Sequence, residues 1–172
     1  MNPKWFGDSY DIVKRFFASS LRKLGYEVYI DPMLTGAWGG DVDNLYRFLK
    51  MRPVDEYTNS MSALFLDPDT GIGRSTSPKH TTIQTIGSHL QNHEIVFAFD
   101  QSFSRGPDAR PQIQEKLSAL RALNATGVYF DSHARFLFAS FERARLEALQ
   151  DYLGKVGLPK NRFVSLESPH RQ

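Results

Sequence analysis

The sequence predicts a three-layer α/β domain of Rossmann type, with a mostly parallel sheet and an antiparallel hairpin near the C-terminus. Three hydrophobic runs, at 28–30, 63–66 and 95–99, each lead into an aspartate, and helical patterns lie between them. Such uncharged runs are typical of parallel strands that helices cover on both faces. Two later runs, 127–130 and 135–141, are too close for a parallel crossover and therefore predict the hairpin.

The composition matches a single domain over residues 1–172, because 41% of the residues are hydrophobic and can form a sizeable core. The 21 basic residues nearly balance the 19 acidic ones, so the net charge of +2 makes no general case for nucleic acid or an anionic membrane. The chain has no cysteine, which excludes disulfides, thiolate metal sites and a cysteine nucleophile. It has no signal-peptide core and no apolar run near the roughly 20 residues that span a bilayer. We therefore expect a soluble, cytoplasmic protein with no membrane segment.

The chain is expected to begin with a helix. Asp8 can cap this helix, apolar residues then recur at helical spacing, and Gly25 ends it. A strand at 27–31 follows directly, and a glycine-rich loop at 35–40 leads into a helix at 42–49. This order of helix, strand, loop and helix indicates an α/β fold.

The middle of the chain continues the alternation of strands and helices. A polar loop at 52–60 leads to a strand at 62–66, which carries no charge and is expected to be buried on both faces. A polar segment at 75–79 precedes a short helix at 82–90 and a third strand at 94–99. The sequence therefore predicts a parallel pair of strands joined by a crossover helix.

The last third of the chain begins with a long exposed loop at 102–111. Loops of this length in a compact domain are often functional. The remaining predicted elements are a helix at 113–123, the hairpin strands at 127–130 and 135–141, a helix at 142–153 and an edge strand at 163–166.

The aspartates at the strand ends are the most specific candidates for chemistry. Asp67 and Asp69 follow one buried strand, and Asp100 follows the next. Carboxylate oxygens are ligands that Mg²⁺ prefers, so these three acids are predicted to hold a divalent cation and to act in catalysis. The alternative is that Asp67 to Gly71 is a tight turn, in which Pro68 fixes φ and Gly71 accepts a positive φ.

Five further residues are candidates for substrate binding. Asp31, Thr35 and Gly36 would lie beside the Asp67 loop if the two strands are neighbours, where backbone amides could hold an anion. Lys79 and Arg105 lie in polar loops and could neutralise phosphate, Arg105 through its planar guanidinium. The alternative for each is an exposed loop residue without a ligand.

His133, in the predicted hairpin turn, is a candidate general base that Asp131 could orient. The alternative is an ordinary turn, since Asp and Ser are common turn residues. His89 and His93 have the spacing of a helical metal pair, but no third ligand of matching spacing follows them.

These residues together predict a Mg²⁺-dependent phosphoester hydrolase that acts on nucleic acid or a nucleotide, with nuclease as one such activity. Asp67, Asp69 and Asp100 would hold the cation, Lys79 and Arg105 would neutralise phosphate, and His133 would be the base. A non-catalytic interaction module is an alternative, in which exposed Trp5 and Trp38 contact a partner. The sequence leaves a protein partner or a homo-oligomer open.

The order of features also resembles the methyltransferase-like Rossmann domain of the three-Cys-motif partner family. The resemblance lies in residues 9–14, in the strand end and glycine loop at 29–36, in Phe65-Leu66-Asp67-Pro68, and in the aromatic hairpin at 129–139. It implies a methyltransferase-like protein, active or degenerate. Such a protein would bind S-adenosylmethionine or another adenosine-containing ligand at the Asp31 and Asp67 loops.

Overall fold

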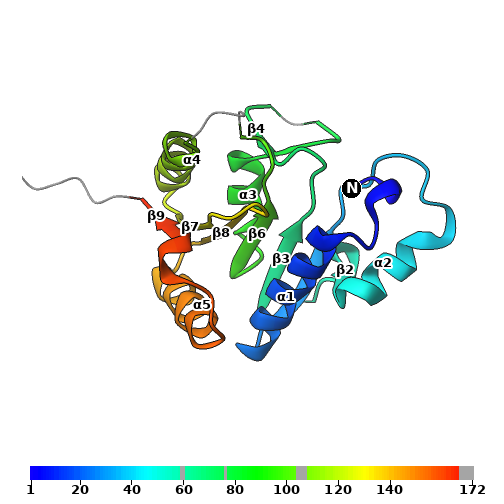
Figure 1. Ribbon diagram of the computed structural model, residues 1–172, viewed down its shortest axis with the longest axis horizontal. Helices are drawn as coiled ribbons and strands as arrows, with labels where there is room; N and C mark the ends of the chain where they lie inside the picture. The colour runs from blue at the N-terminus through cyan, green and yellow to red at the C-terminus, as the bar shows by residue number, and fades with distance from the viewer. Residues whose placement is uncertain (59–60, 76, 104–107, 167–172) are drawn as a thin grey trace, which may run out of the picture.

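The computed structural model describes residues 1–58, 61–75, 77–103 and 108–166 of the chain (Figure 1). A seven-stranded sheet in the order β2-β1-β3-β6-β8-β7-β9 forms its centre. The strands of this sheet are β1 (Glu27–Asp31), β2 (Arg52–Pro53), β3 (Ser62–Leu66), β6 (Ile95–Phe99), β7 (Thr126–Phe130), β8 (Phe136–Ser140) and β9 (Phe163–Ser165). Two short parallel strands, β4 (Ile72–Gly73) and β5 (Thr81–Thr82), form a separate pair.

Five α-helices and four short 3-10 helices are found in the described part of the chain. The α-helices are α1 (Ser9–Lys23), α2 (Val42–Leu49), α3 (Ile83–His89), α4 (Arg110–Ala122) and α5 (Arg143–Lys155). The 3-10 helices are η1 (Pro3–Trp5), η2 (Gly39–Asp41), η3 (Val54–Glu56) and η4 (Lys160–Arg162).

The direction of the strands matches the prediction. Strands β2, β1, β3 and β6 are parallel, and β8 is antiparallel to β6. Strands β7 and β8 form the predicted hairpin, and β9 is the predicted edge strand, antiparallel to β7. The chain therefore has a Rossmann-like α/β fold with antiparallel C-terminal strands.

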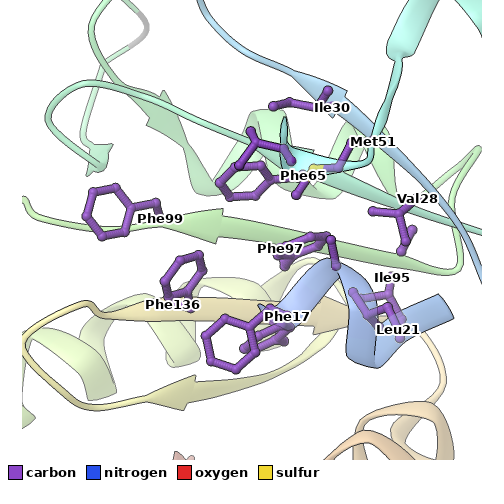
Figure 2. Close-up of a cluster of buried hydrophobic side chains, with 14 of the residues drawn as sticks. Phe17, Leu21, Val28, Ile30, Met51, Phe65, Ile95, Phe97, Phe99 and Phe136 are labelled. Atoms are coloured by element: carbon purple, nitrogen blue, oxygen red, sulfur yellow. The ribbon is translucent and has the colours of Figure 1, made fainter. Parts of the chain in front are cut away.

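The pleat of the sheet divides its buried side chains between two cores. Successive residues of a strand point to opposite faces, so Phe65 and Phe97 lie in one core and Leu64 in the other. Helices α1, α2 and α5 cover the first core, and α3 and α4 cover the second (Figure 1). Figure 2 shows the first core, in which Phe17 of α1 packs on Phe136 with 4.8 Å between ring centroids.

Helix α1 brings two charged side chains to the first core. Asp8 caps the helix as predicted, because its carboxylate accepts from the backbone N–H of Tyr10 at 2.8 Å. The buried face that holds Phe17 on the sheet also contains Asp11 and Lys14, at positions spaced by three residues. The first turns of α1 therefore direct an acid and a base towards the sheet.

Two local expectations are corrected by the structure. The predicted loop at 52–60 begins with strand β2, which pairs with β1 at an edge where Pro53 is tolerated. Trp38, expected to be exposed, is buried, and its indole N–H donates to the backbone oxygen of Met1 at 3.0 Å. An indole can be buried once its N–H has such a partner. Trp5, the other tryptophan expected to be exposed, is 58% exposed.

None of the α-helices in the described ranges combines the length and the apolar character that crossing a bilayer requires.

Candidate ligand pocket at the carboxyl edge of the sheet

A cavity of about 360 Å³ lies at the carboxyl edge of the sheet, between the ends of β3 and β6 and the start of α1. Its walls combine three aromatic side chains, four carboxylates and one lysine. The lining residues are Met1, Asn2, Trp5, Asp8, Tyr10, Asp11, Lys14, Asp67, Pro68, Asp69, Phe99 and Gln101. Open α/β sheets bind ligands at this edge.

Lys14 is the central charged group of the pocket. Its ammonium donates to Asp11 at 2.8 Å and to Asp67 at 2.9 Å, and the three side chains are at most 5% exposed. The second oxygen of Asp11 accepts from the backbone N–H of Gly7 at 2.8 Å, which holds the acid in place. The result is a buried chain of acid, base and acid.

The protonation of this group follows from its contacts. Burial acts to lower the pKa of Lys14, but the adjacent Asp67 and Asp11 outweigh it and raise that pKa above its ordinary value. Burial raises the pKa of Asp67, and the Lys14 ammonium opposes this change. Lys14 therefore stays charged at neutral pH.

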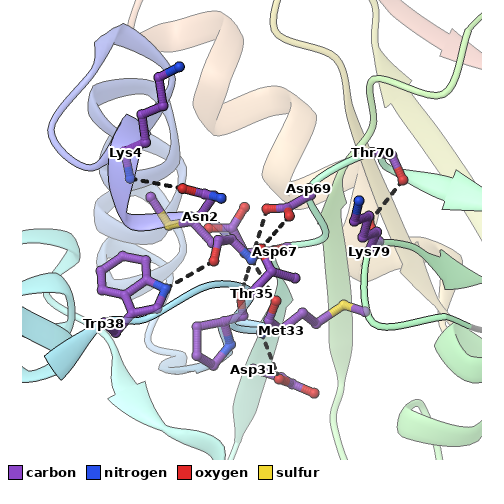
Figure 3. Close-up of polar contacts among 12 residues, drawn as sticks. Asn2, Lys4, Asp31, Met33, Thr35, Trp38, Asp67, Asp69, Thr70 and Lys79 are labelled. Atoms are coloured by element: carbon purple, nitrogen blue, oxygen red, sulfur yellow. Dashed lines mark hydrogen bonds and ion pairs between the residues drawn. The ribbon is translucent and has the colours of Figure 1, made fainter.

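Asp69 joins the loops that follow β1 and β3. One carboxylate oxygen accepts from the hydroxyl of Thr35, and the other lies 3.1 Å from the amino group of Met1 (Figure 3). The same amino group donates to the backbone oxygens of Pro32 at 2.9 Å and Met33 at 2.6 Å. The expected proximity of the two loops is confirmed, because β1 and β3 are neighbours.

Asp31 and Gly36 shape the first of these loops. The Asp31 carboxylate accepts from the backbone N–H of Met33 at 3.0 Å, and its backbone oxygen accepts from Asp67 N at 3.1 Å. Gly36 has φ +77°, a conformation that favours glycine. Within this loop, Thr35 contacts Asp69 directly, and Asp31 and Gly36 support the backbone around it.

Asp100 points to the other face of the sheet. Its carboxylate accepts from Tyr129 at 2.7 Å, from Lys116 of α4 at 2.6 Å and from the backbone N–H of Ile72 at 3.0 Å. The hydroxyl of Ser102 donates to it at 2.7 Å. Asp100 thus ties the end of the Asp67 loop to α4, on the side opposite Lys14.

The separation of the acids follows from strand register. Leu66 pairs with Ala98, so Asp67 lies one residue beyond this pair and Asp100 two residues beyond it. Because side chains alternate between faces, these two acids leave the sheet in opposite directions. Among the described residues, no three His, Asp or Glu side chains gather closely enough to hold a metal ion.

The other predicted site residues lie around this edge. The exposed ring of His133 stacks on Tyr10 at the pocket, with 5.8 Å between centroids, whereas Asp131 is paired with Arg135 at 2.7 Å. Lys79 has an exposed side chain, and its backbone oxygen accepts from the hydroxyl of Thr70 at 2.9 Å (Figure 3). Arg105 lies outside the described residues.

Sequence reasoning missed the pocket residues that come from α1 and β6. Asp11 and Lys14 lie on the face of α1 that also carries Phe17 and Leu21, so charged residues at core-facing positions were a usable signal. Phe99 is also part of the pocket wall. Its position in a uniformly buried strand gave no comparable signal.

Comparison of the chain with protein-family models, with curated proteins and with solved structures finds no match.

Proposed function

We propose that this pocket binds an adenosine-containing small molecule, of the S-adenosylmethionine or nucleotide class, in a methyltransferase-like protein, active or degenerate. The observation that supports this proposal most is the cavity of about 360 Å³ with Trp5, Tyr10 and Phe99 in its walls. Its volume is within the range of small-molecule sites, which are mostly apolar with a few polar groups. Aromatic side chains offer faces on which a flat base can stack.

The position of the pocket also supports the proposal. The methyltransferase-like resemblance implies an adenosine-containing ligand at the Asp31 and Asp67 loops. These loops are adjacent, and Asp67 lines the pocket. The hairpin β7–β8, which also contributes to the resemblance, brings His133 to the same edge through its contact with Tyr10.

The charges of the pocket favour a ligand that enters with a neutral or cationic group. Four carboxylates and two cationic groups line the cavity, so negative charges outnumber positive ones. The carboxylates are those of Asp8, Asp11, Asp67 and Asp69, and the cationic groups are Lys14 and the amino group of Met1. A phosphodiester in the cavity would be repelled by this excess. This balance favours S-adenosylmethionine or a nucleoside portion over a nucleic-acid backbone.

The test is isothermal calorimetry without metal, using S-adenosylmethionine, S-adenosylhomocysteine and adenosine. We expect saturable binding to the wild-type protein, with at least tenfold weaker binding by Tyr10→Ala, about 1.4 kcal/mol. Tyr152→Ala on α5, away from the pocket, is the matched control and should bind normally. Absence of binding by all three ligands would contradict the proposal.

A Mg²⁺-dependent phosphoester hydrolase is the second candidate, because Asp67 and Asp69 line the same pocket. A divalent cation that binds the folded state raises the melting temperature. This candidate predicts that Mg²⁺ or Mn²⁺ raises the melting temperature of the wild-type protein, whereas an Asp67→Ala, Asp69→Ala double variant does not respond. No rise in the wild-type protein, with or without a nucleotide present, would count against it.

A further inference from the structure

The ammonium of Lys14 can donate one more hydrogen bond than its strong acceptors in the protein receive. A lysine ammonium has three N–H donors, and two of those of Lys14 are matched by Asp11 and Asp67. Its other polar contact among the described residues is the sulfur of Met1, at 4.0 Å. A thioether is a weak acceptor, so the third N–H lacks a strong partner although it belongs to a buried cation.

The surroundings of Lys14 determine what can reach this third N–H. Lys14 lines the cavity, and its ammonium lies 5.3 Å from the centroid of Phe99, an aromatic wall of the same cavity. A ligand group that enters along Phe99 can therefore meet a donor that is already fixed in direction by two carboxylates. The Lys14 side chain is already ordered, so it loses little conformational entropy when it donates a hydrogen bond to a ligand.

We propose that the third N–H of Lys14 fixes the ligand of this pocket and takes an uncharged hydrogen-bond acceptor. The inference rests on the proposed function and narrows it, because the acceptor would be a hydroxyl, carbonyl or ring nitrogen of the nucleoside portion. A phosphate or carboxylate is excluded from this position. Lys14 is thus a binding residue as well as the partner of two acids.

The exclusion of an anion follows from the charges around Lys14. Asp11 and Asp67 together exceed the single positive charge of Lys14. The second cation of the cavity, the amino group of Met1, is paired with Asp69, and Asp8 adds a further acid, so the excess of negative charge remains. A third anion on the ammonium would lie near both carboxylates in a poorly solvated place, where like charges repel strongly. An uncharged acceptor gains the hydrogen bond without this repulsion.

The ammonium groups can be observed directly by NMR of protein with ¹⁵N-labelled lysine, assigned through the bonds of each side chain. Burial and ion pairing slow proton exchange of Lys14 and also of Lys116, which is held by Asp100 at 2.6 Å on the other face of the sheet. Lys116 is therefore an internal control within the same molecule. The probes are adenosine and inorganic phosphate, added separately at neutral pH.

We expect adenosine to shift the Lys14 ammonium signal, with a saturation curve that matches calorimetry, and to leave Lys116 unchanged. Inorganic phosphate should shift neither signal. If adenosine binds by calorimetry without moving the Lys14 signal, or if phosphate moves it, the inference is overturned and the proposed function stands. If no adenosine-containing ligand binds by calorimetry, the proposed function fails, and this inference fails with it.

Discussion

The ammonium of Lys14 is the residue-scale feature on which the pocket depends. It lies between Asp11 and Asp67, and all three groups are buried. Taking charges out of water costs free energy, which close pairing and hydrogen bonds offset only while all partners are present. Loss of the single cation would leave two carboxylates facing each other in the first core.

We therefore expect Lys14→Met to lower the free energy of unfolding by about 3–5 kcal/mol. Urea denaturation followed by circular dichroism measures this change. Lys155→Met, at an exposed position at the end of α5, should change stability by less than about 0.5 kcal/mol. A loss in Lys14→Met no larger than that of the control would show that the buried ion pairs do not form.

His93 is a second titratable residue with an altered environment. Burial lowers its pKa from 6.5 to about 4, with a further contribution from His89, and its Nδ1 lies 2.9 Å from the hydroxyl of Ser62. The unfolded chain thus binds more protons than the folded protein between these pH values. The free energy of unfolding is therefore highest above pH 6.5 and falls as the pH is lowered towards 4.

This shift predicts a loss of about 2–3 kcal/mol in unfolding free energy as the pH falls from 6.5 to 4. Urea denaturation at a series of pH values measures it. His93→Gln should flatten the curve in this window, and His133→Gln, at an exposed position, should leave it unchanged. Equal slopes in all three proteins would argue against a buried neutral His93.

The loop from Asp67 to Gly71 is the decisive structure at the scale of elements. Asp67 is tied to α1 through Lys14, and Ile72, just beyond the loop, is tied to Asp100. Gly71 allows the loop to turn in this way, because its φ is +90° and it packs against Asp100 and Gln101, the two residues that follow β6. A Cβ at this position would lie 2.5 Å from the backbone nitrogen of Gln101.

Gly71→Ala is therefore expected to destabilise the protein by at least about 2 kcal/mol, from the left-handed conformation and from the steric overlap. Gly40→Ala is the matched control, because a Cβ there meets nothing within 4 Å. Its effect should stay below about 0.5 kcal/mol. Thermal and urea denaturation compare the two variants, and similar stabilities would contradict the described loop.

The elements of the fold were predictable because their signals are local. The uncharged runs at 62–66 and 95–99 and the Asp8 cap each predict a structure from a few neighbouring residues. The candidate site was less predictable because it depends on direction and on distant partners. The sequence placed Asp67 and Asp100 at the correct edge, but the face to which each points depends on the register between β3 and β6. The partnership of Lys14 with Asp67 spans 53 residues, and no local pattern predicts it.

At the scale of the whole molecule, the sheet separates two ionic clusters. Lys14 with Asp11 and Asp67 lies on the α1 face, and Asp100 with Lys116 and Tyr129 lies on the α4 face. Burial raises the pKa of Tyr129 well above its ordinary value, and the adjacent Asp100 adds to this shift. Both faces therefore contain a group that retains its proton more firmly in the folded protein than in the unfolded chain.

This arrangement predicts a loss of stability at alkaline pH. The unfolded chain releases the Tyr129 proton near pH 10.0 and the Lys14 proton near 10.5, whereas the folded protein retains both. The unfolded state then binds fewer protons, so the free energy of unfolding falls as the pH rises above about 10. Urea denaturation between neutral pH and pH 11 measures the decline, which should be shallower in Tyr129→Phe. A stability that is constant over this range would contradict the assignment.

The alternation of side chains along β6 also defines what this scaffold would need in order to hold a metal. Position 99 is directly beside Asp67 in the strand register and faces the pocket, but the chain has phenylalanine there and its acid one residue later. A single-residue offset thus decides whether the side chain beside Asp67 is an aromatic wall or a further carboxylate. A Phe99→Asp variant would add a carboxylate beside Asp67 to the four that already line the cavity, whereas Phe99 as it stands gives this wall of the cavity an aromatic face.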